Sequence, residues 1–286
     1  MKHLKIIGIG TGIILTVVVV GFFVIHKKAV LSQSVIPLQL ASPSDSPLVA
    51  GAPEKTLQVT SDISKIPILT YHSFGPKPIT KETSMQAHYR VTPENFEAQM
   101  KYLAEKNYQT ITFADLIESQ VLGKPIPENA IVLTFDDGWK SQYDYAVPIL
   151  EKYKFTGTFF IITGAIGATS YMTVDELKTL HTKGFEIASH TVSHPKLPTL
   201  EDAQLVQEIQ ASKKTLEDKL GIIVTTLAYP YYAHDVRVMQ AVRDAGYLGA
   251  RAGWGGFKNN TEHLFELKSQ EVVNNPNPFS DKRVDQ

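Results

Sequence analysis

The sequence contains no cysteine, and it has no marked excess of either charge. Without cysteine there are no disulfides and no thiolate metal sites, so any metal must be held by His, Asp or Glu. The formal net charge of -1 gives no electrostatic footprint for nucleic acid, which we exclude as a partner. No particular protein partner is predicted. The 286 residues, 43% hydrophobic and 20% charged, suit one sizeable globular domain with appendages.

A charge-free apolar run occupies residues 6–25, and two lysines flank it on each side. Its length matches the roughly 20 apolar residues that span a bilayer core. A secretory signal has a shorter apolar region of about 7–15 residues and a small-residue cleavage site, which "HKKAVLSQS" does not offer. We therefore predict an uncleaved single-pass membrane anchor over residues 1–28. The flanking lysines balance, so orientation rests on the long polar chain that follows, which we expect to be extracytoplasmic.

Residues 29–65 are rich in Ser, Pro, Ala and Leu and have no sustained period, which predicts a linker. From residue 66 to residue 286, strand and helix patterns alternate at least five times. Capping residues such as Thr92 and Thr173 mark helix starts, and glycines such as Gly184 mark helix ends. Strands are expected at 66–74, 130–135, 157–162, 185–189, 224–230, 247–251 and 265–273.

This alternation favours parallel strands joined by crossover helices, in a barrel or in a doubly wound sheet. No Gly-x-Gly-x-x-Gly motif follows the first strand, which argues against a dinucleotide-binding sheet. In both architectures, catalytic groups gather where the parallel strands end. The residues that follow each strand are therefore the candidates for function.

The strand 130–135 runs directly into Asp136, Asp137 and Gly138. Successive strand residues point to opposite faces, so both carboxylates can face one site only where the strand breaks. Gly138 permits such a break. A polar turn that caps the next helix is the alternative interpretation.

The strand 185–189 is followed by "HTVSHP", which contains His190 and His194. This spacing puts both imidazoles on one face of a helical turn. With a carboxylate from another strand end they make a His-His-Asp set with open positions, as in hydrolytic metal centres. Purely structural histidines are the alternative.

The strand 224–230 runs into "AYPYY", in which Pro230 enforces a turn. Backbone N–H groups in such a turn can be aimed at a developing oxyanion. The tyrosines either stack on a sugar ring or pack the loop, and both interpretations stay open.

The motifs "TFDDG" (134–138), "SHTVSH" (189–194) and "AYPY" (228–231) occur in the order typical of one family. Together they resemble the polysaccharide deacetylases, carbohydrate esterase family 4 or the nodulation-protein-B homology domain. The resemblance covers about residues 130–273. The segment "YHSF" (71–74) is similar to the N-terminal part of poly-N-acetylglucosamine deacetylases, which makes that branch the nearest one.

The resemblance implies a deformed (β/α) barrel of about seven strands. It implies that Asp137, His190 and His194 hold a divalent metal, commonly zinc in the family. Asp136 would be the catalytic base, and the backbone N–H of Tyr231 would stabilise the oxyanion together with the metal. Adjacent aspartates would then have separate roles, one as a ligand and one as a proton acceptor.

The sequence departs from the family pattern at several positions. The last strand, 265–273, lacks the histidine that serves many members as general acid, although Leu267 in it would line the acetyl pocket. His72 is our candidate for the catalytic site in its place, and His263 is a weaker substitute. The family arginine that orients the base is Ala228 here. That change affects base orientation more than metal binding.

Two aromatic residues are assigned to the substrate. Tyr232 stands where the family has a glycine, and Trp254 lies in "ARAGWGG". Each would stack on a sugar ring. Alternatively, Trp254 is a loop aromatic that covers the barrel mouth.

The leading hypothesis is a membrane-anchored, metal-dependent hydrolase that removes N-acetyl groups from an extracellular or cell-wall polymer containing N-acetylglucosamine. Such an enzyme acts on carbon–nitrogen bonds other than peptide bonds. Poly-N-acetylglucosamine and peptidoglycan are the main candidate polymers, and chitin oligomers are a further one. An O-acetyl esterase and a catalytically weak surface polysaccharide-binding protein are the alternatives.

Overall fold

The structure is a computed structural model that describes residues 59–60, 62–76, 89–253 and 259–279. The predicted membrane anchor, residues 1–28, lies outside the described residues, as do most of the predicted linker and the candidate Trp254. Among the helices that are described, none combines the length and the apolar character needed to cross a bilayer.

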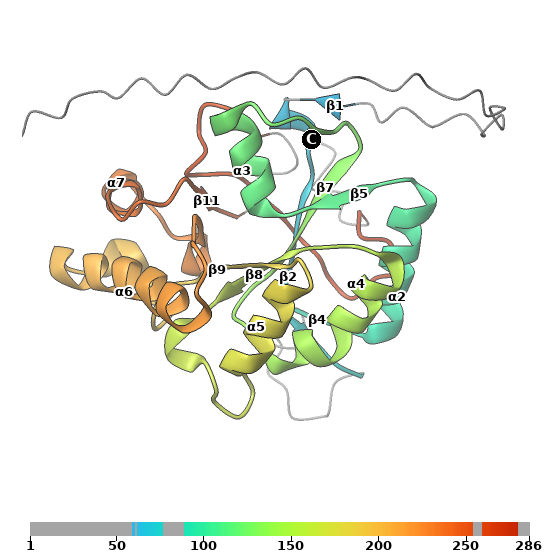
Figure 1. Ribbon diagram of the computed structural model, residues 1–286, viewed down its shortest axis with the longest axis horizontal. Helices are drawn as coiled ribbons and strands as arrows, with labels where there is room; N and C mark the ends of the chain where they lie inside the picture. The colour runs from blue at the N-terminus through green and yellow to red at the C-terminus, as the bar shows by residue number, and fades with distance from the viewer. Residues whose placement is uncertain (1–58, 61, 77–88, 254–258, 280–286) are drawn as a thin grey trace, which may run out of the picture. The chain divides into compact units, whose positions relative to one another are not determined.

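A curled sheet of parallel strands forms the centre of the fold (Figure 1). Seven strands follow one path in the order β11-β10-β9-β8-β7-β2-β12, and β5 pairs with β7 beside that path. The predicted α/β class is confirmed, and the curled sheet corresponds to the expected deformed barrel. The strands are β2 (Ile68–Tyr71), β5 (Gln109–Ile111), β7 (Ala130–Phe135), β8 (Thr158–Ile161), β9 (Glu186–Ser189), β10 (Thr226–Ala228), β11 (Gly249–Arg251) and β12 (Gln270–Glu271).

One chain segment, residues 267–271, contacts both ends of this sheet. Leu267 forms a parallel bridge with Arg251 of β11, and its backbone N–H donates to the carbonyl of Ala250 at 3.1 Å. Three residues later, β12 pairs in parallel with β2. The expected strand 265–273 is therefore a single bridge followed by a two-residue strand, because its residues divide their pairing between two neighbours.

Side chains of the strands alternate between two apolar clusters, as the pleat requires. Leu69 and Leu133 belong to an outer cluster, whereas their neighbours Ile68 and Val132 belong to an inner one. Both faces of the sheet are thus buried, which is typical of parallel sheets. Along β7, Val132, Thr134 and Asp136 are alternate residues and therefore share the inner face. The pleat thus directs Asp136, just past the end of the strand, to the inner side of the curled sheet.

Most helices supply residues to the outer cluster, whereas α3 packs on the inner one. The predicted caps Thr92 and Thr173 accept from backbone N–H groups, and Gly123 and Gly221 end their helices in left-handed conformation. The helices are α2 (Pro93–Glu105), α3 (Phe113–Leu122), α4 (Val147–Tyr153), α5 (Val174–Thr182), α6 (Asp202–Leu220) and α7 (Val236–Asp244).

Three expectations about boundaries need correction. The predicted linker extended to residue 65, but β1 (Val59–Thr60) pairs with β6 (Ile126–Pro127), and Ile63 is buried in the inner cluster. The strand expected at 66–74 divides at His72 into β2 and β3 (Ser73–Phe74), because β3 pairs with β4 (Arg90–Val91) instead of β7. The sequence pattern of residues 141–153 predicts one continuous α-helix, but the structure has a π-helix at Gln142–Ala146 before α4.

Candidate metal and catalytic site

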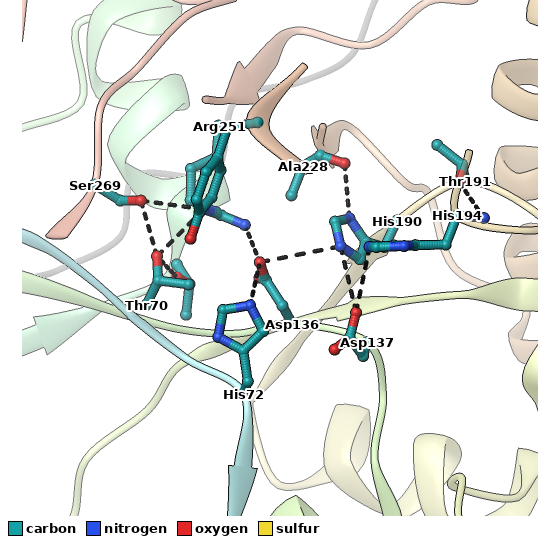
Figure 2. A network of polar contacts seen from close by, with 12 residues as sticks. Thr70, His72, Asp136, Asp137, His190, Thr191, His194, Ala228, Arg251 and Ser269 are labelled. Carbon is teal, nitrogen blue, oxygen red and sulfur yellow. Dashed lines mark hydrogen bonds and ion pairs between the residues drawn. The ribbon is translucent and has the colours of Figure 1, made fainter. Parts of the chain in front are cut away.

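Four polar residues lie on the inner face of the sheet at the end where the strands finish (Figure 2). His72 follows β2, Asp136 follows β7 and His190 follows β9, while Arg251 is the last residue of β11. His72 and Asp136 align because Tyr71 pairs with Phe135 in the register between β2 and β7. All four side chains point toward one centre, so the parallel sheet brings together residues that are distant in sequence.

Asp137 turns toward the same centre because the strand breaks there. Its φ is 77° and that of Gly138 is 80°, both in the left-handed region. This turn rotates Asp137 away from the outer face that strict alternation would give it. Both neighbouring carboxylates therefore reach one site, as the sequence predicted.

Asp137, His190 and His194 form a compact set of ligand atoms. Their candidate donor atoms all lie within 4.8 Å of one another. Oδ1 of Asp137 lies 3.6 Å from Nε2 of His190 and 3.5 Å from Nε2 of His194. Ligand atoms at tetrahedral angles around zinc, each about 2.05 Å from the metal, are about 3.3 Å apart. The three side chains therefore fit a small divalent metal ion with little adjustment.

The imidazole of His190 is held in the tautomer that a metal needs. Its Nδ1 lies 2.8 Å from the carbonyl oxygen of Ala228, which can only accept, so Nδ1 carries the proton and Nε2 faces the site. Burial lowers the pKa of His190 to about 4, although Asp136 and Asp137 act in the opposite direction. At neutral pH the ring is uncharged and can act as a ligand.

The segment that carries the two histidines is an irregular loop that bends at Val192 and Ser193, not the helical turn that their spacing predicted. Thr191 and His194 have φ values of 67° and 60°, and the N–H of His194 donates to Oγ1 of Thr191 at 3.1 Å. The carboxylate of Glu208 on α6 accepts from the N–H groups of Val192 and Ser193. A carboxylate from a neighbouring helix therefore fixes this loop.

Trp139 holds the second oxygen of Asp137. Its indole N–H donates to Oδ2 at 2.9 Å, and its ring stacks on Tyr171 with centroids 4.3 Å apart. The contact leaves Oδ1 directed at the two histidines. Sequence reasoning missed this residue, although an aromatic residue two positions after the paired aspartates was a visible signal.

Asp136 is 2% exposed, and its charge is neutralised by Arg251. The guanidinium lies on the side of Asp136 away from Asp137 and the two histidines (Figure 2). The fully buried guanidinium contacts Oδ2 of Asp136 and also donates to Thr70 and Ser269 at 3.2 and 3.1 Å (Figure 2). Burial alone would raise the pKa of Asp136, but Arg251, His190 and His72 outweigh it and lower the pKa. Asp136 is therefore ionised at neutral pH.

Arg251 orients Asp136 in this structure. It takes the place of the arginine that the family has at the position of Ala228. The arginine comes from the next strand, β11, which pairs with β10 so that Ala228 lies opposite Arg251. The change to Ala228 was expected to affect the orientation of Asp136, but the neighbouring strand β11 places a guanidinium against that carboxylate. The sequence feature that could have indicated this role is a charged residue at the end of the apolar strand "YLGAR".

His72 lies beside Asp136, with Nε2 3.8 Å from Oδ2 of that carboxylate. Its ring packs against Tyr89 at a centroid distance of 4.9 Å, and it keeps 20% of its side chain exposed. The side-chain amide of Gln142 donates to the backbone carbonyls of both His72 and Asp136, which ties the two strand ends together. The structure thus brings His72 into the site, whereas His263 is exposed and contacts Glu266.

The remaining candidates lie in different places. Tyr231 has φ 55° in the turn after β10, and its exposed ring lies 4.7 Å from that of His194. Tyr232 donates its hydroxyl to Glu271 at 2.7 Å, so this polar group is engaged within the protein. Leu267 is 1% exposed in the inner cluster and lines neither cavity described below, so its place in an acetyl pocket stays a prediction.

Two cavities flank the candidate metal-binding set and share Asp137 and Trp139 in their walls. One, of about 460 Å³, presents aromatic rings, hydroxyls and charged groups, and the other, of about 450 Å³, borders His194. Aromatic faces and hydroxyls suit sugar rings. The first cavity is lined by His72, Ser73, Phe74, Tyr89, Arg90, Asp137, Trp139, Lys140, Ser141, Asp144, Tyr145, Thr169 and Ser170.

Comparisons with known proteins agree with this arrangement. Residues 123–250 match the family model described as polysaccharide deacetylase. The chain is 32% identical over 188 residues to YxkH, a candidate polysaccharide deacetylase of Bacillus subtilis, covering 66% of this chain and 64% of that protein. It is 26% identical over 211 residues to the poly-beta-1,6-N-acetyl-D-glucosamine N-deacetylase of Staphylococcus aureus, covering 69% and 68% of the two chains.

Solved structures share the fold. The Streptococcus pyogenes deacetylase PplD, in complex with acetate, matches with a TM-score of 0.70 at 24% identity over 81% of this chain and 100% of that one. A polysaccharide deacetylase from Bacillus cereus matches with a TM-score of 0.64 at 27% identity, over 73% and 65% of the two chains. The sheet and its crossover helices are therefore those of a deacetylase fold.

Proposed function

The chain belongs to the polysaccharide deacetylase family, and from this premise we propose that it is a metal-dependent N-deacetylase of N-acetylglucosamine-containing polysaccharide. The observation that carries the proposal is the division of labour between two adjacent aspartates. Asp137 is directed at two imidazoles, whereas Asp136 is ionised beside them and oriented by Arg251. A site with three ligands and a separate base suits hydrolysis.

Asp137, His190 and His194 would hold the divalent ion, for which zinc is our proposal. When bound there, such an ion supplies Lewis acidity toward an acyl oxygen and toward a water molecule. The neutral state of His190 and its tautomer match this role, as does the contact that fixes Asp137.

Asp136 is proposed to accept the proton of the attacking water. Arg251 holds Oδ2, while the buried Oδ1 has no hydrogen-bond partner among the described residues. Oδ1 is therefore the oxygen that can receive a proton. The lowered pKa keeps the group ionised before each turnover.

The backbone N–H of Tyr231 is proposed to stabilise the oxyanion that forms when water adds to the acetyl carbonyl. Hydrogen bonds donated by the N–H groups of Tyr232 and Ala233 close the turn, so the turn itself does not use the N–H of Tyr231. His72 is the proposed acid, because the departing amine requires a proton and His72 lies beside the base with part of its ring exposed.

The substrate is inferred from the relatives and the cavity walls. The Staphylococcus aureus relative is named for poly-beta-1,6-N-acetyl-D-glucosamine, which favours that polymer over peptidoglycan and chitin oligomers. Tyr89, Trp139 and Tyr145 line the larger cavity together with serine hydroxyls, a combination that suits pyranose rings. The chain matches less than two thirds of the length of its Bacillus subtilis relative. The identity of the polymer that this chain acts on is therefore a proposal.

We also propose that residues 1–28 anchor the protein in the cell membrane with the catalytic domain extracytoplasmic. The charge-free run 6–25 and the polymeric substrate support this placement. Membrane fractionation followed by protease treatment of intact cells tests it. Recovery of the chain in the soluble fraction, or protection of the domain in intact cells, contradicts it.

The function is tested by acetate release from N-acetylglucosamine oligomers, with and without a chelator and with zinc add-back. Chelator-sensitive release that zinc restores supports the N-deacetylase. Release from acetyl esters alone favours the O-acetyl esterase, because the same centre can attack an ester. Tight polymer binding without release from either substrate favours the polysaccharide-binding protein.

A further inference from the structure

The turn that carries the proposed oxyanion donor has an unusual backbone. Tyr231 and Tyr232 are consecutive non-glycine residues with φ values of 55° and 58°. Residues with a Cβ are uncommon in this left-handed region because the side chain approaches the backbone. Two in succession require contacts from elsewhere in the fold to hold them.

The side chain of Tyr232 makes such contacts on three sides. Its hydroxyl donates to Oε1 of Glu271 at 2.7 Å. The guanidinium of Arg251 lies 5.4 Å from the centroid of its ring. On another side the ring occupies the space where a side chain at position 253 would begin, so Gly253 makes room for it. Tyr232 is therefore fixed at both its ring and its hydroxyl.

Glu271 provides a rigid anchor for that hydroxyl. It belongs to β12, which pairs with β2 through the register of Glu271 with Thr70. The residue is 7% exposed, and its second oxygen has no hydrogen-bond partner among the described residues. A buried carboxylate with so few donors depends strongly on the hydroxyl of Tyr232.

The same contacts join two parts of the proposed catalytic site. Tyr232 is the next residue after Tyr231, whose N–H is the proposed oxyanion donor. The ring of Tyr232 lies against the guanidinium of Arg251, which orients Asp136. A shift of the Tyr232 ring would therefore move the oxyanion donor and loosen the arginine.

We propose that Tyr232 and Glu271 are positioning residues, which hold the turn so that the Tyr231 N–H faces the developing oxyanion. The inference rests on the proposed deacetylase function, since it assigns a task within that reaction. It also replaces the expectation that Tyr232 stacks on the sugar.

The test compares Tyr232→Phe, which removes only the hydroxyl, with Glu271→Gln, which keeps an acceptor oxygen. Tyr247→Phe is the matched control, because Tyr247 is a buried tyrosine of the outer cluster whose hydroxyl bonds to Ser212 and Ile209 of α6. Each variant of the full, zinc-loaded chain is assayed for kcat, KM and zinc affinity. Loss of one oxyanion donor costs about 10²–10³-fold in kcat, so its displacement should cost about 10–100-fold.

The expected result is that kcat of Tyr232→Phe falls about 10–100-fold, with KM and zinc affinity within about twofold of wild type. Glu271→Gln should stay within about threefold, since its amide oxygen still accepts, and Tyr247→Phe within about twofold. A kcat for Tyr232→Phe no lower than that of the control overturns the proposal. So does a rise in KM at constant kcat, which would identify a substrate contact.

A second measurement separates this inference from the proposed function. If the wild-type chain releases no acetate from any acetylated substrate, the proposed function fails. The binding of acetate to the zinc-loaded chain, followed by NMR titration, then decides the inference. Weakening by about tenfold in Tyr232→Phe but not in Tyr247→Phe supports positioning of the turn, and equal affinities overturn it.

Discussion

Replacing Arg251 with methionine tests whether the buried guanidinium is what keeps Asp136 charged and oriented. Arg251 is fully buried and Asp136 is 2% exposed, so water cannot substitute for the lost partner. Methionine has a similar length and leaves the apolar packing largely intact. The change therefore isolates the charge and its hydrogen bonds.

Removing one member of a buried ion pair typically destabilises a protein by about 3–5 kcal/mol, because the other charge remains buried without compensation. Arg251 also donates to Thr70 and Ser269, which are both buried, so the upper half of that range is expected. Without the arginine, burial raises the pKa of Asp136, and each unit of rise corresponds to about 1.4 kcal/mol. A higher pKa favours the protonated form of Asp136, so the proposed deacetylase should lose kcat together with stability.

Urea unfolding of the metal-free protein measures the stability change, with Arg237→Met as the matched control. Arg237 pairs with Asp202 on the surface, where side chains are 39% and 86% exposed, so its loss should cost at most about 1 kcal/mol. Adding Asp136→Asn to Arg251→Met should recover part of the loss, because the uncompensated charge disappears. The reasoning is refuted if Arg251→Met costs no more than the control, or if the double variant is less stable than Arg251→Met.

Three further predictions concern single side chains. Trp139→Phe keeps the stack on Tyr171 but loses the N–H that holds Asp137. Zinc affinity, measured by chelator competition, should therefore fall about 10–100-fold. An unchanged affinity contradicts this role. His72→Asn should lower kcat on N-acetyl substrates by about 10²–10⁴-fold but much less on 4-nitrophenyl acetate, whose leaving group needs no proton; equal losses would exclude an acid. Burial raises the pKa of Glu186, so its folded form retains a proton that the unfolded chain releases, and stability falls as pH rises through and above the usual glutamate range. Urea unfolding at roughly pH 4 and pH 8 should therefore show Glu186→Gln gaining on wild type at the higher pH, and a constant difference would disprove the coupling.

The sequence predicted well what depends on local patterns. Caps such as Thr92 and Thr173 mark helix starts in the fold as in the sequence. The apolar strand 130–135 carries the paired aspartates to its end, and the two histidines follow the strand that ends at Ser189. Periodicity and capping are short-range features, so one sequence is enough to read them.

Features that depend on pairing between distant segments were missed. Arg251 contacts Asp136 across 115 positions of sequence, and only the order of strands in the sheet makes them neighbours. Glu208 reaches the histidine loop from α6, 16 positions after Val192, and this contact depends on how the helix packs beside the loop. A one-sequence pattern identifies residues at strand ends but does not tell which strands are adjacent.

Local exceptions to regular geometry were also beyond the sequence patterns. The spacing of His190 and His194 suggested a helical turn, but Thr191 and His194 adopt left-handed backbone and the segment is an irregular, bent loop. The burial of Leu267 follows from its bridge to Arg251, which its own strand pattern does not indicate.

The most direct test of the account compares Asp136→Asn with Asp137→Asn, since the two residues are adjacent and chemically identical. For each variant, zinc affinity and kcat on N-acetylglucosamine oligomers are measured side by side. Asp136→Asn should bind zinc nearly as wild type and lose about 10²–10⁴-fold in kcat, because only the base is removed. Loss of a residue that only holds a metal ligand in place costs roughly 10–100-fold in metal affinity. Asp137→Asn should lose more zinc affinity than that, because it removes a ligand itself. Equal loss of zinc in both variants, or retained kcat in Asp136→Asn, would contradict the separation of roles.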